Sequence, residues 1–124
     1  PTIKNNIFTC IAGPALGKWS YQGTLNLDFN NFYNCSAPPP QAHTILGNPL
    51  FVATGSDWHL AANSPAIGKG TAITVLGFKG ETLLVNKDRD GKMRTTPWDL
   101  GIYATSEAAA DTTPPAQPII VSIR

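Results

Sequence analysis

The stretch NNIFTC at residues 5–10 returns as NNFYNC at residues 30–35, an offset of 25 residues. Two asparagines, an apolar residue, an aromatic residue and a cysteine recur in the same order. Self-similarity at a fixed period of 20 to 50 residues is the signature of a solenoid. In a parallel β-helix each coil lies ~4.8 Å from the next, so equivalent asparagines and apolar side chains stack. The repeat therefore predicts two such coils, and the alternative is a coincidence between two asparagine-rich turns.

The rest of the chain favours strands and turns over helices. Eleven prolines and eleven glycines are spread over 124 residues, and proline breaks helix interiors. Short runs of β-branched and aromatic residues stand between these breaks, as in strands. We expect an all-β chain with no large helix, and strands within residues 3–9, 24–29, 31–35, 43–46, 50–53, 73–78, 82–85, 101–104 and 119–123.

A series of motifs within residues 48–104 points to a known family. In chain order they read NPLFV at 48–52, DWHL at 57–60, NSPAIGKGT at 63–71, KDRDGKMR at 87–94 and DLGIY at 99–103. This order resembles the closing region of right-handed parallel β-helix proteins of the pectate-lyase-like class, with departures at Gly68, Lys69 and Ala104. The resemblance implies that residues 1–104 are the C-terminal coils and cap of such a domain. It implies a polysaccharide partner less firmly, because the class spans lyases, hydrolases, epimerases, adhesins and binding modules.

Both ends of the chain suggest a larger protein. Residues 105–118 are rich in Pro, Thr and Ala and resemble the linkers of secreted bacterial multidomain proteins, while residues 119–124 are typical of the start of a following strand or domain. Residue 1 enters a coil with no capping helix before it, and an uncapped coil leaves an open strand edge. We therefore expect upstream coils, on the same or a separate chain.

Charge and hydropathy limit the kinds of partner and the cellular location that we expect. The net charge is +1 and charged residues make up 14% of the chain, whereas a protein that tracks phosphates needs a patch of one sign. The four cations within residues 87–94 alternate with Asp88 and Asp90. No run of ~18 apolar residues is present, so no membrane span is encoded. We expect a secreted, extracellular protein that binds no nucleic acid.

The two cysteines, Cys10 and Cys35, have three readings. One coil apart, their Cα atoms would lie ~4.8 Å from each other, within the range that a disulfide needs. The alternative is a stacked pair of reduced thiols facing the core. A metal half-site is the third reading, but His43 and His59 show no ligand spacing with either cysteine. The sequence leaves disulfide and stacked pair open.

Residues 86–93 partly match a calcium-binding loop. Asn86, Asp88, Asp90 and Gly91 stand at the spacing of its first, third, fifth and sixth positions. The acidic ligand required at the twelfth position is replaced by Pro97. We expect instead a turn held by hydrogen bonds from Asp side chains to local backbone and by pairing with Arg94. We expect no cofactor, and calcium at Asp88 and Asp90 is the alternative.

The aromatic residues are the candidates for contact with sugars, because aromatic rings stack on sugar faces. Trp19 and Tyr21 lie in the loop between the two repeat copies, and Trp58 and Trp98 lie in the closing region. The alternative role of the last two is to cover the end of the core. His59, beside Trp58, joins the candidates.

No complete active site is predicted within these residues, and the catalytic residues are unknown. A lyase needs a Brønsted base and a hydrolase two carboxylates across the bond, and no pair of acids recurs at the coil period. We expect an extracellular, polysaccharide-directed protein of which this chain is a non-catalytic, carbohydrate-binding β-helix portion. The first alternative is the C-terminal fragment of a polysaccharide lyase or glycoside hydrolase with its catalytic coils upstream. The second is an adhesin or surface-structural β-helix.

Overall fold

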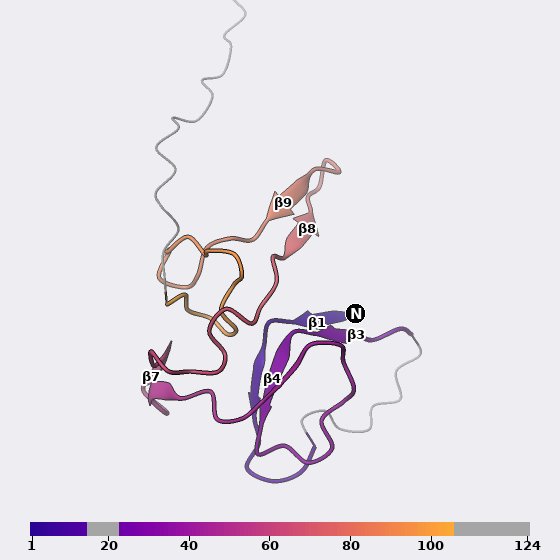
Figure 1. Cartoon of the computed structure of the whole chain (residues 1–124). Helices are drawn as coiled ribbons and strands as arrows, with labels where there is room; N and C mark the ends of the chain where they lie inside the picture. The colour runs from indigo at the N-terminus through magenta and orange to yellow at the C-terminus, as the bar shows by residue number, and fades with distance from the viewer. Residues whose placement is uncertain (15–22, 106–124) are drawn as a thin grey trace, which may run out of the picture.

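The computed structural model describes residues 1–14 and 23–105, and within them the chain is all-β (Figure 1). This confirms the expected class, since the described residues contain short strands and no helix. No helix that could cross a membrane is therefore found in this part of the chain. The strands are β1 (Thr2–Lys4), β2 (Ile7–Thr9), β3 (Asn26–Asp28), β4 (Asn30–Tyr33), β5 (Thr44–Leu46), β6 (Phe51–Ala53), β7 (Asp57–Leu60), β8 (Thr74–Leu76) and β9 (Thr82–Leu84).

Two small parallel sheets occupy the first half of the chain. β1 pairs with β3, and β4 lies between β2 and β5. Each pair is parallel, so the chain has to travel back to the same end before each new strand. These sheets are small and open, and they confirm the all-β class of the chain.

The register of the parallel pairs differs from the one that the repeat predicted. Phe8 lies opposite Phe32 rather than Tyr33, and the Asn6 amide contacts Asn30, 24 positions later, rather than Asn31. The offset in the strands is thus 24 residues and not 25. A shift of one residue moves a side chain to the other face of the sheet, so the observed register is the one that stacks two phenylalanine rings. Their centroids lie 5.0 Å apart with planes 7° from parallel.

Matching corners explain this register. Asn5 turns the chain between β1 and β2, and Phe29 turns it between β3 and β4, both with positive φ (61° and 53°). The Asn5 N–H donates to the Phe29 carbonyl at 2.9 Å, so the two corners lie next to each other. Asparagine adopts this backbone conformation readily, but a bulky residue such as phenylalanine seldom does. The repeated asparagine at position 30 therefore does not mark the second corner.

The disulfide alternative is correct for the cysteines. Cys10 and Cys35 are joined, with their Cα atoms 4.9 Å apart. The Cys10 N–H donates to the Tyr33 carbonyl at 3.0 Å, which continues the β2–β4 ladder to this point. The disulfide thus joins the chain just after β2 to the chain just after β4, with an offset of 25 residues where the strands have 24.

Residues 51–67 and Leu100, in the later part of the chain, pack against the parallel sheets. β6 and β7 form one antiparallel hairpin and β8 and β9 another. The β7 strand was not predicted, and residues 101–104, predicted as a strand, have irregular backbone. The Leu100 N–H donates to the Ala66 carbonyl at 3.0 Å, so the segments around these residues run side by side. Buried Leu60, Ala66 and Leu100 form the core cluster, with partly buried Ile7, Phe29, Ile45, Phe51 and Ile67 packed on it.

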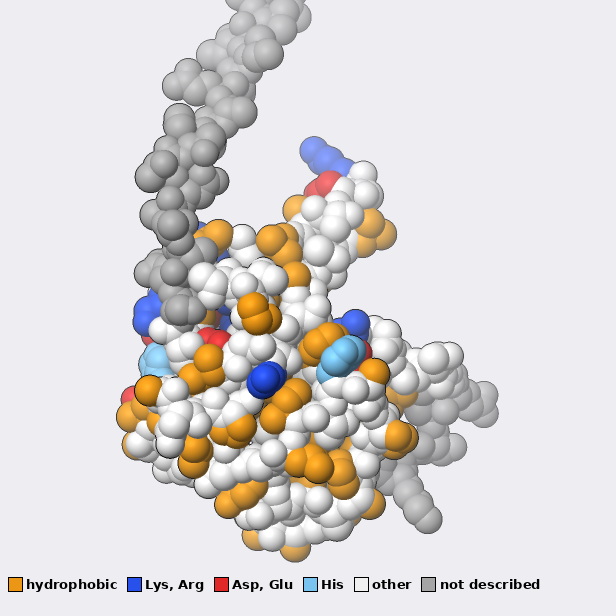
Figure 2. Space-filling model, viewed as in Figure 1, with side chains coloured by type: hydrophobic (Ala, Val, Ile, Leu, Met, Phe, Trp, Pro, Cys, Tyr) orange, Lys and Arg blue, Asp and Glu red, His pale blue; other side chains and the backbone are white. Residues whose placement is uncertain are grey.

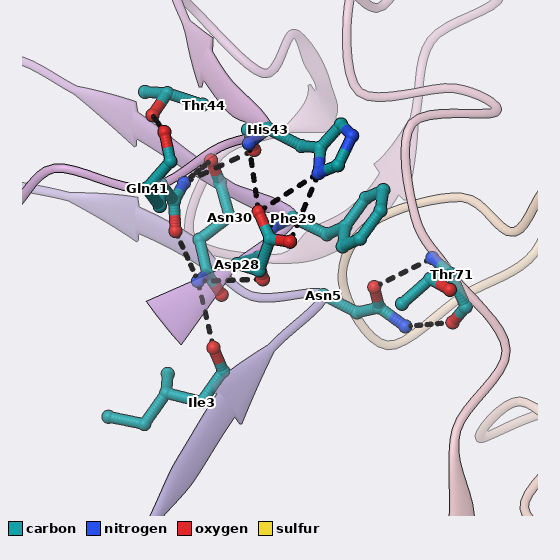
Figure 3. Close-up of polar contacts among 9 residues, drawn as sticks. All are labelled: Ile3, Asn5, Asp28, Phe29, Asn30, Gln41, His43, Thr44 and Thr71. Carbon is teal, nitrogen blue, oxygen red and sulfur yellow. Dashed lines mark hydrogen bonds and ion pairs between the residues drawn. The ribbon is translucent and has the colours of Figure 1, made fainter. Parts of the chain in front are cut away.

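Asn5 joins the two halves (Figure 3). Its side-chain Nδ2 donates to the Thr71 carbonyl at 2.6 Å, and its Oδ1 accepts the Thr71 N–H at 2.9 Å. Its own carbonyl accepts the Gly101 N–H at 2.9 Å. Gly70 lies so close that a Cβ there would stand 3.0 Å from the Asn5 Oδ1 and 2.9 Å from the Trp98 carbonyl oxygen. The corner between β1 and β2 is thereby fixed to the segments that contain Thr71 and Gly101.

Candidate functional site

Trp58 lies in a surface cleft beside the corner between β1 and β2. Alternation along β7 puts Trp58 and Leu60 on one face and Asp57 and His59 on the other. Leu60 enters the core, while Trp58 keeps 43% of its surface exposed. The rings of Trp58 and Phe51 pack edge to face, with centroids 5.0 Å apart and planes at 86° to each other. The cleft measures about 260 Å³ and is lined by Asn5, Asn6, Ile7, Phe51, Trp58, Gly101 and Ile102.

Asn6 supplies the exposed polar side chain of this cleft. Its Nδ2 donates to the Lys4 carbonyl at 2.7 Å and to the Asn30 Oδ1 at 3.1 Å, which holds the amide in place. Its Oδ1 accepts no hydrogen bond from the described residues. The cleft therefore offers an aromatic ring, aliphatic walls and a fixed amide whose oxygen is available to a hydroxyl group.

His59 lies on the opposite face of β7, between two carboxylates. Its Nδ1 is 2.6 Å from the Asp57 Oδ1 and its Nε2 is 3.0 Å from the Asp90 Oδ2. Its ring stacks on Tyr103 with centroids 3.8 Å apart. The hydrogen bond with Asp57, and after it the one with Asp90, raises the pKa of His59 above its ordinary 6.5. The backbone N–H and then the ring of His59 lower the pKa of Asp57. With both ring nitrogens bonded, His59 links elements and is not poised as a base.

Trp98 is buried, with 3% of its surface exposed. Its carbonyl accepts the Gly70 N–H at 2.6 Å, and the Arg94 guanidinium lies over its ring, 5.7 Å from the centroid. Trp98 thus takes the second of its two predicted roles, packing in the closing region, and has little ring surface to offer a ligand.

Hydrogen bonds to the backbone hold the turn at Asp88. One Asp88 carboxylate oxygen accepts the Lys92 N–H and the other the Ala104 N–H, each at 2.8 Å. Burial opposes ionisation, but these bonds outweigh it and lower the pKa of Asp88. Arg94 does not pair with an Asp side chain as expected; it donates to the carbonyls of Asp99 and Gly101 at 3.1 and 2.9 Å. Asp90 turns to His59, and no cluster of three or more potential metal ligands occurs in the described residues.

A second His–Asp pair, which the sequence did not reveal, lies at the corner of the parallel sheets (Figure 3). The His43 Nδ1 is 3.0 Å from the Asp28 Oδ2, and its ring stacks on Phe29 at 4.1 Å. Burial raises the pKa of Asp28, but the His43 ring and the N–H groups of His43 and Phe29 outweigh it, so the pKa is lowered. His43 borders a groove of about 550 Å³ with Lys69 on its wall. Only the pairing of β4 with β5 brings these residues together, so no local motif could have signalled them.

Of the predicted aromatic candidates that the structure describes, only Trp58 lies in an exposed cleft. His59 is its neighbour in the strand but faces away from that cleft. Trp19 and Tyr21 lie outside the described residues.

No known protein family, curated protein or solved structure matches this chain. The residues of the cleft therefore carry the functional argument by themselves.

Proposed function

We propose that this protein binds polysaccharide, with Trp58 as the aromatic platform for a sugar ring. The observation that carries the proposal is the exposed Trp58 ring in a cleft of aliphatic and amide groups. The C–H face of a pyranose stacks on an aromatic ring, and a few polar groups beside the ring fix its orientation. Asn6 has the position and the fixed amide for that second role.

The same cleft favours binding over catalysis. None of the residues that line it is acidic or basic, whereas glycoside hydrolysis uses two carboxylates that flank the scissile bond. Nearby carboxylates have other partners: Asp57 and Asp90 bond to His59, and Asp88 bonds to backbone N–H groups. The chain therefore fits a non-catalytic, carbohydrate-binding portion.

We also propose that β1–β5 belong to the C-terminal coils of a right-handed parallel β-helix, and the parallel pairing of these strands supports this fold. Successive parallel strands, adjacent corners at Asn5 and Phe29, and the Phe8–Phe32 stack are all features of coils laid on one another. Within the described residues the outer edges of β1 and β2 have no partner strand. Upstream coils, on this chain or another, are the partner that these edges fit.

The disulfide supports a secreted, extracellular location, because disulfides persist mainly in oxidising compartments. This location also suits a polysaccharide ligand. If catalytic coils lie upstream, the longer protein is a polysaccharide lyase or glycoside hydrolase and this chain contributes its closing region and a sugar contact.

Affinity gel electrophoresis tests the binding proposal. The protein is run through gels that contain pectin, alginate, xylan or cellulose derivatives, beside gels without polysaccharide. We expect retardation in at least one gel, lost in Trp58→Ala and kept in Phe78→Ala, which also removes an exposed aromatic ring but far from the cleft.

Two results would count against the proposal. Equal mobility in every gel would favour the adhesin or surface-structural alternative, and unchanged retardation of Trp58→Ala would move the contact away from the cleft. Release of oligosaccharides by the intact, longer protein would instead assign the parent to the enzymes.

A further inference from the structure

The β8–β9 hairpin exposes apolar side chains to an unusual degree. Leu76 is 76% exposed, Phe78 at the turn is fully exposed, and Val75, Leu83 and Leu84 are each about half exposed. In Figure 1 the hairpin projects away from the other strands, and in Figure 2 hydrophobic side chains lie along it. A group of apolar side chains exposed together marks an interaction site more often than scattered ones do.

The backbone of this hairpin also lacks partners. Among the described residues β8 and β9 pair only with each other. The Gly77 N–H donates to Glu81 and the Val85 N–H to Ile73 across the hairpin. Because antiparallel pairs alternate, the N–H and C=O groups of Thr74, Leu76, Thr82 and Leu84 point outward. An isolated two-stranded hairpin is marginal in water, and an unpaired edge is a template for another strand.

One face of the hairpin bears a shallow groove. Val75 lies opposite Leu83, so both side chains stand on the same face. Together with Leu76 and Phe78 they line a groove of about 350 Å³. An apolar face next to an open edge fits a partner that is itself a strand with one apolar face.

The chain carries such a segment beyond the described residues. Residues 119–123 read IIVSI, a run rich in β-branched residues, which suit strands. In an extended conformation Ile119, Val121 and Ile123 would share one face and Ile120 and Ser122 the other. The first of these faces is wholly apolar, as a partner for Val75 and Leu83 must be.

The intervening chain is long enough to reach the hairpin. The Ala104 N–H donates to the Asp88 Oδ2 at 2.8 Å, so the end of the described chain lies beside a residue three positions past Val85 at the base of the hairpin. Seven residues from Val85 to Phe78 span ~24 Å of strand. The thirteen residues 106–118 reach ~43 Å when fully extended. Every position along the hairpin is therefore within range.

We propose that residues 119–123 add a third strand to an edge of the β8–β9 hairpin and extend its apolar face. Ile119, Val121 and Ile123 stand on the same face as Val75 and Leu83 and pack beside them, and backbone hydrogen bonds join the new strand to the outward-pointing groups. This is strand addition at an exposed edge, made within one chain, and it does not depend on the sugar-binding proposal.

Paramagnetic NMR on the full chain tests this inference. A nitroxide label is attached to Arg124→Cys while Cys10 and Cys35 stay oxidised, and the amide signals of residues 74–84 are recorded. We expect these signals to broaden, and the broadening to disappear in Val121→Asp but persist in Ser122→Asp. The two variants introduce the same charge at adjacent positions, on the apolar and the polar face of the proposed strand.

Each other outcome overturns the inference. Absence of broadening in the hairpin means that the segment binds elsewhere or not at all. The hairpin signals can also be recorded in a mixture of isotope-labelled chains without a nitroxide and unlabelled chains that carry one. Broadening in that mixture means that the hairpin pairs with a second copy. Equal loss in Val121→Asp and Ser122→Asp means that charge, and not the apolar face, is responsible.

Discussion

The Asn5 side chain forms two hydrogen bonds with the backbone of Thr71, a residue 66 positions further along the chain. The amide thereby bonds both backbone polar groups of the half-buried Thr71, while the backbone of Asn5 forms the corner between β1 and β2.

Replacing Asn5 tests that connection. Asn5→Gly keeps a backbone that tolerates positive φ but removes both bonds and leaves Thr71 unpaired, so we expect the free energy of unfolding to fall by ~2–3 kcal/mol. Asn34→Gly is the matched control, because Asn34 also has positive φ (56°) but is exposed. Urea denaturation measures both, and an equal small effect would show that Asn5 acts only as a corner residue.

Replacement of the two adjacent asparagines in β4 should change the stability of the protein in opposite directions. Asn30 is fully buried and its side chain bonds to Asn6, to Gln41 and to backbone carbonyls. Asn31 is equally buried between Ile7 and Ile45, but its Oδ1 has no hydrogen-bond partner among the described residues.

We therefore expect Asn30→Leu to destabilise the protein by ~3 kcal/mol or more, and Asn31→Leu to be neutral or stabilising by ~1 kcal/mol, since an apolar side chain of similar shape avoids the cost of an unpaired polar atom. Thermal denaturation of the two variants and of the parent chain measures these changes in stability. Similar losses in both variants would mean that the Asn31 bond to Gly47 outweighs its unpaired oxygen.

Removal of the disulfide should lower stability through the unfolded chain. Cys10 and Cys35 close a loop with a sequence separation of 25. In the chain-entropy model that closure contributes ~3 kcal/mol, so we expect Cys10→Ser/Cys35→Ser to lose about this much. Reductant should lower the unfolding midpoint of the parent chain to that of the variant and leave the variant unchanged. A variant that still responds to reductant would contradict the pairing.

Stability should depend on pH through His59. Its pKa is raised in the folded state, so its contribution is fully present below its ordinary 6.5 and is lost as pH rises through the folded-state value. Asp57 behaves conversely: its pKa is lowered, so its contribution is present above the ordinary 3.8 and is lost in acid below it.

We expect NMR titration to give His59 a pKa above 6.5 that falls in Asp90→Asn, because one of its two carboxylate partners is then neutral. Unfolding curves of His59→Gln should show less loss of stability between pH 6 and pH 9 than the parent chain. Identical slopes for parent and variant would contradict this assignment.

Calcium should have no effect on the turn at residues 88–91. The Asp88 carboxylate already accepts two backbone N–H groups, so it has little capacity for a cation. We expect the melting temperature to be the same with calcium and with chelator, and Asp88→Ala to destabilise the protein under both conditions. A chelator-dependent drop in melting temperature would restore the calcium reading.

The sequence could predict those features that depend on local residue type. Proline and glycine spacing predicted an all-β chain, and the cysteine spacing made a disulfide one of two open readings. The register could not be predicted from the repeat, because matching letters placed asparagine on asparagine at a corner that Phe29 occupies at positive φ. Residue preferences argue against such a phenylalanine; its packing against the core compensates.

The candidate site was predictable in its members more than in its arrangement. Trp58, His59 and Asp90 were each singled out, but for separate roles. Alternation along β7 sends Trp58 to the cleft and His59 to Asp90, and only the folded chain brings residues 59 and 90 together. Trp98 could not be told from Trp58 by sequence neighbours alone, because burial depends on segments far away in the chain.

The bonds that Asn5 makes with Thr71 and Gly101 also set the order in which the molecule can be assembled. During synthesis β1 and β2 leave the ribosome long before Thr71 and Gly101 do, so the Asn5 amide stays in water until both partners have emerged. Contacts of such long range slow folding. The corner between β1 and β2 is therefore synthesised well before the segments that secure it.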